Sequence, residues 1–339
     1  FILRAGGDKD APEAITEQSF LPPLRVNHVI RNGHKGGRQR WRCQACGRSF
    51  GPTFGTAMYR LRTPPSEIAR SLLVLMRRGS LSAAEEITGH KYETISRWLR
   101  IAARQAEAIT EALVHDLNLS QVEVDAFWSF VKKGLWPALG MHKQDRASRF
   151  VIAWGFGPTE DEVVPEVVLK TRQRTHAQKG VPWISDGRRA YPKAIGRIYR
   201  DPHRRGTRGR PPLVPTPGVG LTQAVKRRRR GRIVGVEVRR VFGEPVDCPY
   251  PVHQERLNGV LRDRLNALTR KTHGFAKRVS TWDALVVVCL FEHNWIRPHA
   301  ALRERVEGRY RQKTPAVAVG ITNHVWSWEE FLTFRYYHY

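Results

Sequence analysis

The chain has 339 residues, of which 58 are Lys or Arg and 31 are Asp or Glu, so its formal net charge is +27. An enzyme of small metabolites has no need of this excess, which instead predicts a polyanionic partner. The longest apolar run, residues 284–291, is far shorter than the roughly 20 residues of a membrane-spanning helix, and four cysteines do not make a disulfide framework in a chain of this length. We therefore expect a globular protein of a reducing cytoplasm, without a membrane segment or secretory leader.

Residues 1–20 show no usable periodicity and stay unassigned. From residue 21 to 62 the chain is rich in Gly and Arg around Cys43 and Cys46, which have the spacing of two thiolate ligands on a tight turn. This pattern predicts a small zinc-ribbon-like module that could bind Zn²⁺ through Cys43 and Cys46.

The predicted zinc site is short of ligands. A structural zinc ion takes four, and the chain has no second Cys pair. His28 and His34 could complete the site. Alternatively, the module is a β-hairpin that keeps one half of such a site, with Leu21 and Leu24 packing where ligands would stand.

Residues 63–116 are expected to form an all-α helix-turn-helix domain. Apolar positions recur at helical spacing through residues 66–105, and Gly89 allows the positive φ of a tight turn between two helices. The second helix of such a motif enters the major groove of DNA. The side chains predicted to face DNA are therefore those of Lys91, Tyr92, Thr94, Arg97 and Arg100. An ordinary helical hairpin has the same spacing and is the alternative.

Residues 119–300 have the pattern of an α/β domain with a mixed sheet. Apolar runs at 122–131, 135–141 and 150–156 are separated by short polar turns, which predicts three adjacent antiparallel strands. A helix over 160–171 then leads to the run 181–185. We expect this run to pair in parallel as a fourth strand, with Asp186 at its carboxyl end.

Three acids lie in or beside these elements. Asp125 lies in the first strand, Asp186 ends the fourth, and Glu255 opens a later helical pattern. Neighbouring carboxylates repel one another unless a divalent cation neutralises them, and oxygen ligands favour Mg²⁺ or Mn²⁺. The sequence therefore predicts a catalytic metal site made by Asp125, Asp186 and Glu255. Taken alone, Glu255 has a simpler interpretation as a solvated helix glutamate paired with an arginine.

The helix that carries Glu255 has a polar face with Asn258 and Arg262 at helical spacing. With Arg256, these side chains are expected to hold DNA phosphates beside the metal. After them, residues 281–297 are apolar on nearly all sides and predict a buried helix, and residues 301–339 are assigned to a C-terminal extension.

Residues 200–232 are predicted to form a basic insertion in the sheet. The stretch 202–220 is rich in Pro, Gly and Arg and is expected to be flexible, and a strand resumes over 231–242. An unbroken cationic run follows that stretch: Lys226, Arg227, Arg228, Arg229 and Arg230. Such a run can grip DNA phosphates without sequence preference. A solvated, solubilising loop is the alternative.

Three antiparallel strands, a helix, a strand ending in a second Asp and a helix with a late Glu resemble the RNase H-like domain of DDE transposases and retroviral-type integrases. The sequence is most similar to the bacterial insertion-sequence transposases of the InsA/InsB type. Matching segments follow in order from about residue 38 to 330: residues 40–50, 124–131, 185–192, 255–258, 294–299, 314–316 and 324–327.

This resemblance implies that Asp125, Asp186 and Glu255 are a DDE triad, accompanied by Arg256 and Asn258. It implies two-metal phosphoryl transfer on DNA with Mg²⁺ or Mn²⁺, which cleaves element ends and joins them to a target. Both ends must be joined together, so a homodimer or higher oligomer is expected, in the nucleoid-containing cytoplasm of a bacterium. The alternatives are a catalytically inert DNA-binding regulator or domesticated transposase, and an RNase H-like nuclease that does not join strands.

Overall fold

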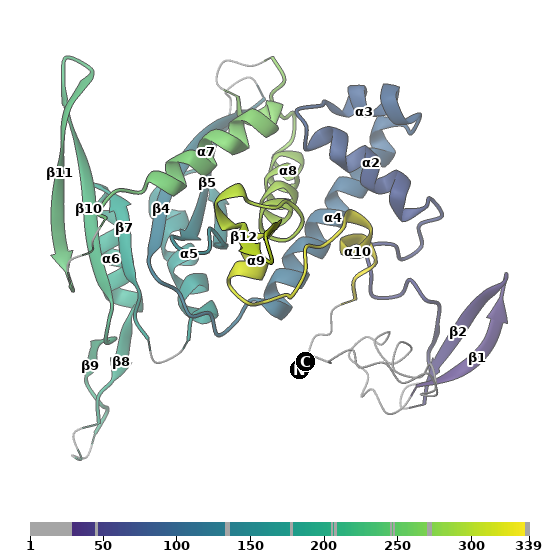
Figure 1. The fold of residues 1–339 in the computed structure, drawn as a ribbon, viewed down its shortest axis with the longest axis horizontal. Helices are drawn as coiled ribbons and strands as arrows, with labels where there is room; N and C mark the ends of the chain where they lie inside the picture. The colour runs from purple at the N-terminus through teal and green to yellow at the C-terminus, as the bar shows by residue number, and fades with distance from the viewer. Residues whose placement is uncertain are drawn as a thin grey trace.

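The computed structural model describes residues 29–44, 47–132, 136–176, 179–204, 206, 209–244, 246, 248–269 and 273–335, with the backbone alone for 136–142. These residues form a six-stranded mixed sheet with helices packed on it, a helical region and a small three-stranded sheet (Figure 1). The expected mixed α/β class is confirmed. In this part of the chain, no helix combines the length and apolar character needed to cross a bilayer.

The large sheet has the order β11-β10-β7-β4-β5-β6. β4, β5 and β6 are antiparallel neighbours, β7 runs parallel to β4, β10 runs parallel to β7, and β11 closes one edge antiparallel to β10. The strands are β4 (Val122–Val131), β5 (Trp136–Asp145), β6 (Val151–Gly157), β7 (Pro182–Asp186), β10 (Gly220–Arg229) and β11 (Arg232–Phe242). The parallel fourth strand is thus observed where the sequence predicted it.

Only part of the predicted basic insertion leaves the sheet. Residues 220–229 form β10, whose first five residues are buried between β7 and β11. Because the second half of this strand is basic, the sequence pattern does not reveal the strand. The predicted end of the basic insertion at residue 232 is therefore wrong. The excursion itself contains a short hairpin, β8 (Arg200–Pro202) with β9 (Leu213–Pro215).

One face of the sheet is covered by α5 (Glu160–Arg174), which also packs against α6 (Ala190–Ile198). α5 lies so close to β6 that a Cβ added at Gly155 would stand 2.6 Å from the side chain of Val167. Glycine is therefore required there for close approach of the helix.

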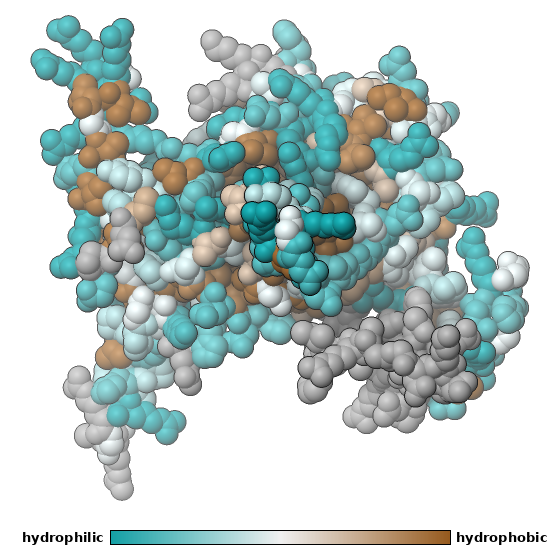
Figure 2. All heavy atoms as spheres, viewed as in Figure 1, coloured by the Kyte–Doolittle hydropathy of each residue, from teal (hydrophilic) through white to brown (hydrophobic). Residues whose placement is uncertain are grey.

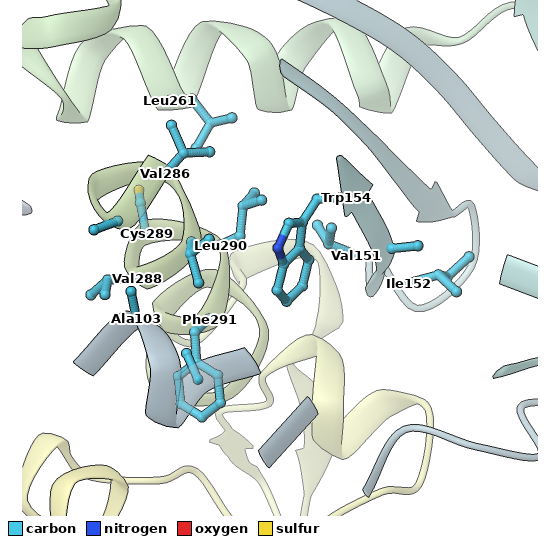
Figure 3. Packing of buried hydrophobic residues seen from close by; sticks show 14 of the residues in the cluster. Ala103, Val151, Ile152, Trp154, Leu261, Val286, Val288, Cys289, Leu290 and Phe291 are labelled. Atoms are coloured by element: carbon cyan, nitrogen blue, oxygen red, sulfur yellow. The ribbon is translucent and has the colours of Figure 1, made fainter. Parts of the chain in front are cut away.

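The other face is covered by α7 (Val252–Arg264) and α8 (Val279–Phe291). Trp282 of α8 contacts the rings of Phe127 in β4 and Phe156 in β6, and α7 crosses β4 and β5 (Figure 1). Leu261 of α7 lies against Val286 of α8 (Figure 3). These contacts fix α7 over the centre of the sheet.

The helical region comprises α2 (Pro65–Leu75), α3 (Leu81–Thr88) and α4 (Tyr92–Leu113). Gly89 ends α3 with a φ of 74°, the left-handed conformation expected for the turn. Ile95 and Trp98 are buried where α4 meets the other two helices. α4 then continues past them and packs along α8.

The C-terminal extension folds back onto this helical region. It contains β12 (Glu304–Val306), β13 (Arg309–Arg311), α9 (Pro315–Ala318) and α10 (Trp328–Thr333), and α10 contacts α2 and α4. The aromatic rings of Phe291, Trp295, Trp326, Phe331 and Phe334 make successive contacts here. One continuous cluster of buried residues runs from Ala57 to Leu332, so the helices and the sheet share a core (Figure 3).

The first described residues form a separate antiparallel sheet of β1 (Val29–Lys35), β2 (Arg38–Cys43) and β3 (Ser49–Phe50). Cys43 is fully buried against Phe50, and its backbone bonds to Gly47 and Arg48 close a tight turn. Cys46 and His28, together with residues 1–20, lie outside the described residues.

His34 cannot complete a zinc site with Cys43. In the β1–β2 ladder Cys43 pairs with Val29, whereas His34 pairs with Gln39 near the turn. Five residues of strand separate the two positions, a distance of roughly 17 Å at about 3.3 Å per residue. The prediction of His34 as a ligand beside Cys43 is therefore wrong.

Candidate active site

Asp125, Asp186 and Glu255 line one open cavity of about 590 Å³. They come from β4, the end of β7 and the first turn of α7. The cavity is completed by the end of β10 and by the segment before α7, with Arg188, Ala224, Lys226, Val236, Tyr250 and Val252 among its lining residues. The structure thus gathers the three acids that the sequence singled out.

Strand register explains why the two aspartates share a face of the sheet. Glu123 pairs with Ile184 across β4 and β7, so two residues further along both strands Asp125 and Asp186 come level. Asp186 in turn pairs with Ala224 of β10. Residues two apart in a strand lie on the same face, which also brings Lys226 to this side.

α7 is held over this face by Glu123, which has no exposed surface. Its Oε2 accepts hydrogen bonds from the backbone N–H groups of His253 and Gln254, at 2.8 and 3.0 Å. Its Oε1 accepts one from Arg146 Nη1 at 2.5 Å. A strand carboxylate therefore caps the amino end of α7, where backbone N–H groups lack helical partners. This cap fixes the position of the first helical turn, which carries Glu255.

Asn258 and Lys226 bind two of the acids directly. Asn258 is almost fully buried, and its Nδ2 donates to Asp125 Oδ2 at 2.9 Å. Lys226 Nζ lies 2.5 Å from Glu255 Oε1 in a partly exposed ion pair. Asn258 thus holds Asp125 in place.

The turn that follows Asp186 is fixed by β10. Gln223 Nε2 donates to the backbone oxygens of Asp186 and Arg188, at 2.7 and 3.0 Å. Gly187 does not adopt a positive φ; a Cβ there would lie 3.0 Å from the side chain of Val225. Glycine therefore serves close packing on β10.

Burial and neighbouring carboxylates raise the proton affinity of Asp125. Burial, followed by the charge of Asp186, raises the pKa of Asp125 to about 6. Glu255 adds to this rise and Lys226 opposes it. Burial likewise raises the pKa of Asp186, while Arg188 and Lys226 lower it. The cavity is thus a cluster of acids short of positive charge.

The donor set suits a hard divalent cation, because all three side chains offer carboxylate oxygens. Glu255 is engaged by Lys226, however. Within the described ranges no three His, Cys, Asp or Glu side chains form a group that could hold a metal ion as they stand. Release of Glu255 from Lys226 would free its carboxylate to bind a cation in the cavity.

The side chains predicted to bind DNA lie on three surfaces. Lys91, Tyr92, Thr94 and Arg97 are exposed at the start of α4, whereas Arg100 is half-buried and lines a second cavity, of about 740 Å³, with Lys277 and Arg278. Lys226, Arg227, Arg228, Arg229 and Arg230 are exposed on the β10–β11 hairpin, which projects at one end of the molecule (Figure 1). Arg256 and Arg262 belong to α7.

The hairpin is less uniformly basic in space than in sequence. Arg227 binds Glu237 of β11 at 2.7 Å, and Arg239 binds the same carboxylate. β11 also exposes apolar side chains, among them Val234, Val236 and Val238. Figure 2 shows brown spheres among teal ones at the left edge of the molecule, where this hairpin lies in Figure 1.

Sequence reasoning missed Glu123 and Arg146. Glu123 is a second charged residue in a mainly apolar strand, two residues before Asp125 and on the same face. A charged residue directed at the buried side of a strand is a signal that could have drawn attention to it. Its partner Arg146, in the turn after β5, has no comparable signal.

Comparisons with known proteins add no assignment. No protein-family model and no curated protein matches the chain.

Proposed function

We propose that this chain is a DDE-type DNA transposase of the bacterial insertion-sequence InsA/InsB type, which cleaves element ends and joins them to target DNA. The observation that carries the proposal is the meeting of Asp125, Asp186 and Glu255 in one cavity, on one face of the sheet. Three acids from segments more than 60 residues apart in the chain would rarely meet by chance in a basic protein.

Two features of the fold support the same class. The order β6-β5-β4-β7-β10, with three antiparallel strands followed by two parallel ones, supports the RNase H-like fold that the resemblance implies. The helical region supplies a three-helix arrangement with an exposed basic start of α4, which suits a helix-turn-helix that reads DNA.

In this mechanism Asp125, Asp186 and Glu255 would hold two Mg²⁺ or Mn²⁺ ions. Such ions lower the pKa of bound water and stabilise the attacking and leaving oxygens of a phosphoryl transfer. Asp125 would be kept in position by Asn258, and Glu255 by the cap that Glu123 places on α7. Arg188 and Lys226, which line the cavity, would contact the phosphate being attacked.

Strand transfer from a labelled 3′-hydroxyl oligonucleotide tests the proposal. The oligonucleotide carries the DNA that flanks the coding sequence, and a supercoiled plasmid serves as target with Mg²⁺ or Mn²⁺. We expect label joined to plasmid, and a loss of at least about 1,000-fold for Asp186→Asn, since electrostatic stabilisation of phosphoryl transfer is worth several kcal/mol. Equal joining by Asp186→Asn would contradict the assignment.

A second readout needs no DNA ends. Mn²⁺ binding, followed by electron paramagnetic resonance, should be lost in Asp125→Asn and Asp186→Asn and kept in Glu166→Gln, an exposed helix glutamate outside the cavity. The Lys226–Glu255 ion pair favours the inert DNA-binding protein as second candidate. Intact DNA binding without Mn²⁺ binding would select it, and cleavage without joining would select a nuclease.

A further inference from the structure

The side of α7 that faces away from Glu255 carries a second group of polar side chains. His253 and Arg256 are three residues apart, and at about 100° per residue they lie roughly 100–160° round the helix from Glu255. Their backbone belongs to the turn that Glu123 caps. The helix N-terminus is thus already satisfied by a carboxylate, and any further ligand here must be bound by side chains.

Two other segments bring cations to this side of α7. The turn between β5 and β6 supplies Arg146 and Arg149, and the segment after the π-helical turn η3 (Glu292–Ile296) supplies Arg297 and His299. We call these residues the cationic cluster: Arg146, Arg149, His253, Arg256, Arg297 and His299.

The proximity of these groups follows from shared contacts. His293 Nε2 lies 3.0 Å from the backbone oxygen of Arg149, and its ring centroid lies 6.1 Å from that of His299. Arg146 and the backbone N–H of His253 are bound to the same carboxylate, that of Glu123. Burial, then the charges of Arg149 and Arg256, lowers the pKa of His299.

The nearby acids lie beneath the cluster and are engaged elsewhere. Glu123 accepts from Arg146 and from the amino end of α7. Asp145 accepts from Ser120 and Ser148. Glu292 accepts from Arg77 and Arg264, at 3.0 and 2.6 Å. All three are almost fully buried, so the outward side of the cluster is left positive.

Two of the arginines are exposed donors. Arg256 and Arg297 are exposed, and neither side chain makes a hydrogen bond or ion pair with another residue of the described ranges. Beside them, His299 Nδ1 accepts from the backbone N–H of Ala301 at 3.3 Å, which leaves Nε2 as the donor of the neutral ring. Guanidinium forks and an imidazole N–H suit the oxygens of a phosphate group.

In the segment 294–299, some residues anchor the backbone and others present polar side chains, as such a site requires. Asn294 donates to and accepts from the backbone of Val151, at 2.9 and 2.8 Å, and so anchors the segment to β6. Trp295 is buried in the aromatic cluster. These two residues hold the backbone, and Arg297 and His299 are thereby presented beside α7.

We propose that the cationic cluster is a second phosphate-binding site, which holds a phosphodiester group of a nucleic-acid backbone on the side of α7 away from the acidic cavity. The site goes beyond the proposed function, because it requires no metal and no catalysis. A strand bound there would lie across α7 from the carboxylates, so the helix would separate two segments of nucleic acid.

Salt-dependent duplex binding tests the site with Arg256→Gln and Arg297→Gln. Both are made in the Asp186→Asn chain without divalent ions, so that failure of strand transfer cannot affect the result. Each lost phosphate contact should lower the slope of log affinity against log salt by about one. The control is Arg305→Gln, an exposed arginine of β12 with the same charge change. Slopes equal to that of the control would overturn the proposal.

The imidazole resonances of His299 provide a direct readout. An anion bound between the arginines stabilises the charged imidazolium, so the pKa of His299 should rise when a short duplex is added. Arg256→Gln should abolish the rise. If inorganic phosphate raises this pKa and the duplex does not, the site binds a free anion and the nucleic-acid assignment is overturned. If neither changes it, the site itself is overturned.

Discussion

The two sides of α7 carry opposite charge for different structural reasons. On one side, the sheet brings Asp125 and Asp186 level and α7 adds Glu255, so three acids face a cavity with few cations to balance them. On the other side, arginines and histidines from α7 and from two other segments lie near buried acids that are already bound. The position of the acidic side is fixed by strand register and its carboxylates repel one another, whereas the cationic side is assembled from α7 and loops and its outward surface stays positive.

Glu123 supports both sides, because it anchors the helix between them. Glu123→Gln would keep the shape but present an NH₂ group to donors, leaving Arg146 without its counter-ion. Breaking a buried pair costs about 3 to 5 kcal/mol, so we expect urea unfolding to show a loss of this size, with strand transfer and duplex binding both reduced.

The matched control for that change is Glu166→Gln, which breaks an exposed pair with Lys170. Exposed pairs contribute at most about 1 kcal/mol. Similar losses in the two variants would mean that Glu123 does not hold α7.

Asp125→Asn tests the self-repulsion of the acidic side through stability. The pKa of Asp125 is about 6 in the folded chain against an ordinary 3.8, so the fold favours the protonated acid. Its ionised form lowers stability above about pH 6, and the penalty vanishes as the pH falls towards 4. We expect the variant to gain up to about 3 kcal/mol at pH 8 and nothing at pH 4, from about 1.4 kcal/mol per pKa unit.

Divalent ions should make the wild-type chain more stable than Asp125→Asn at pH 8, the reverse of the order expected without them. With Mn²⁺ at saturating concentration the wild-type chain gains binding free energy and Asp125→Asn does not. Thermal unfolding at pH 8, with and without Mn²⁺, separates the two effects. A variant that is no more stable than wild type without Mn²⁺ would argue against repulsion among the three acids.

Lys226→Gln gives the smallest expected effect. Its ion pair with Glu255 is nearly half exposed on both partners, so its removal is worth at most about 1 kcal/mol. Freed from this competitor, Glu255 should raise Mn²⁺ affinity by up to about fivefold in a titration calorimeter. The control is Arg232→Gln, an exposed arginine at the start of β11 that does not line the cavity, and it should leave the affinity unchanged.

Local patterns predicted the elements that carry the site. The antiparallel strands, the parallel β7 and the left-handed Gly89 follow from short-range signals, and the three acids were identified from the elements they end or open. β10 was missed because five basic residues follow its apolar start. No local pattern reveals the Glu123 cap or the cationic cluster, because their partners lie up to about 150 residues away in the chain.

The predicted separation into a helix-turn-helix domain and an α/β domain follows the order of segments along the chain, but it does not match how these segments pack. Ile95 and Trp98 belong to the same buried cluster as Phe127 and Trp282, and α4 runs along α8. The sequence gives each segment its own periodicity, but periodicity does not show which apolar faces will meet.

Because the helices and the sheet share one core, the amino-terminal helices cannot be separated from the rest of the chain without exposing apolar surface. α2 packs against α10, which comes from the far end of the chain, and α4 packs along the hydrophobic helix α8. A fragment cut after residue 116 would expose to water the apolar surfaces that pack against α10 and α8. The amino-terminal helices would therefore be a poor choice as an independent DNA-binding domain for fusion to another enzyme.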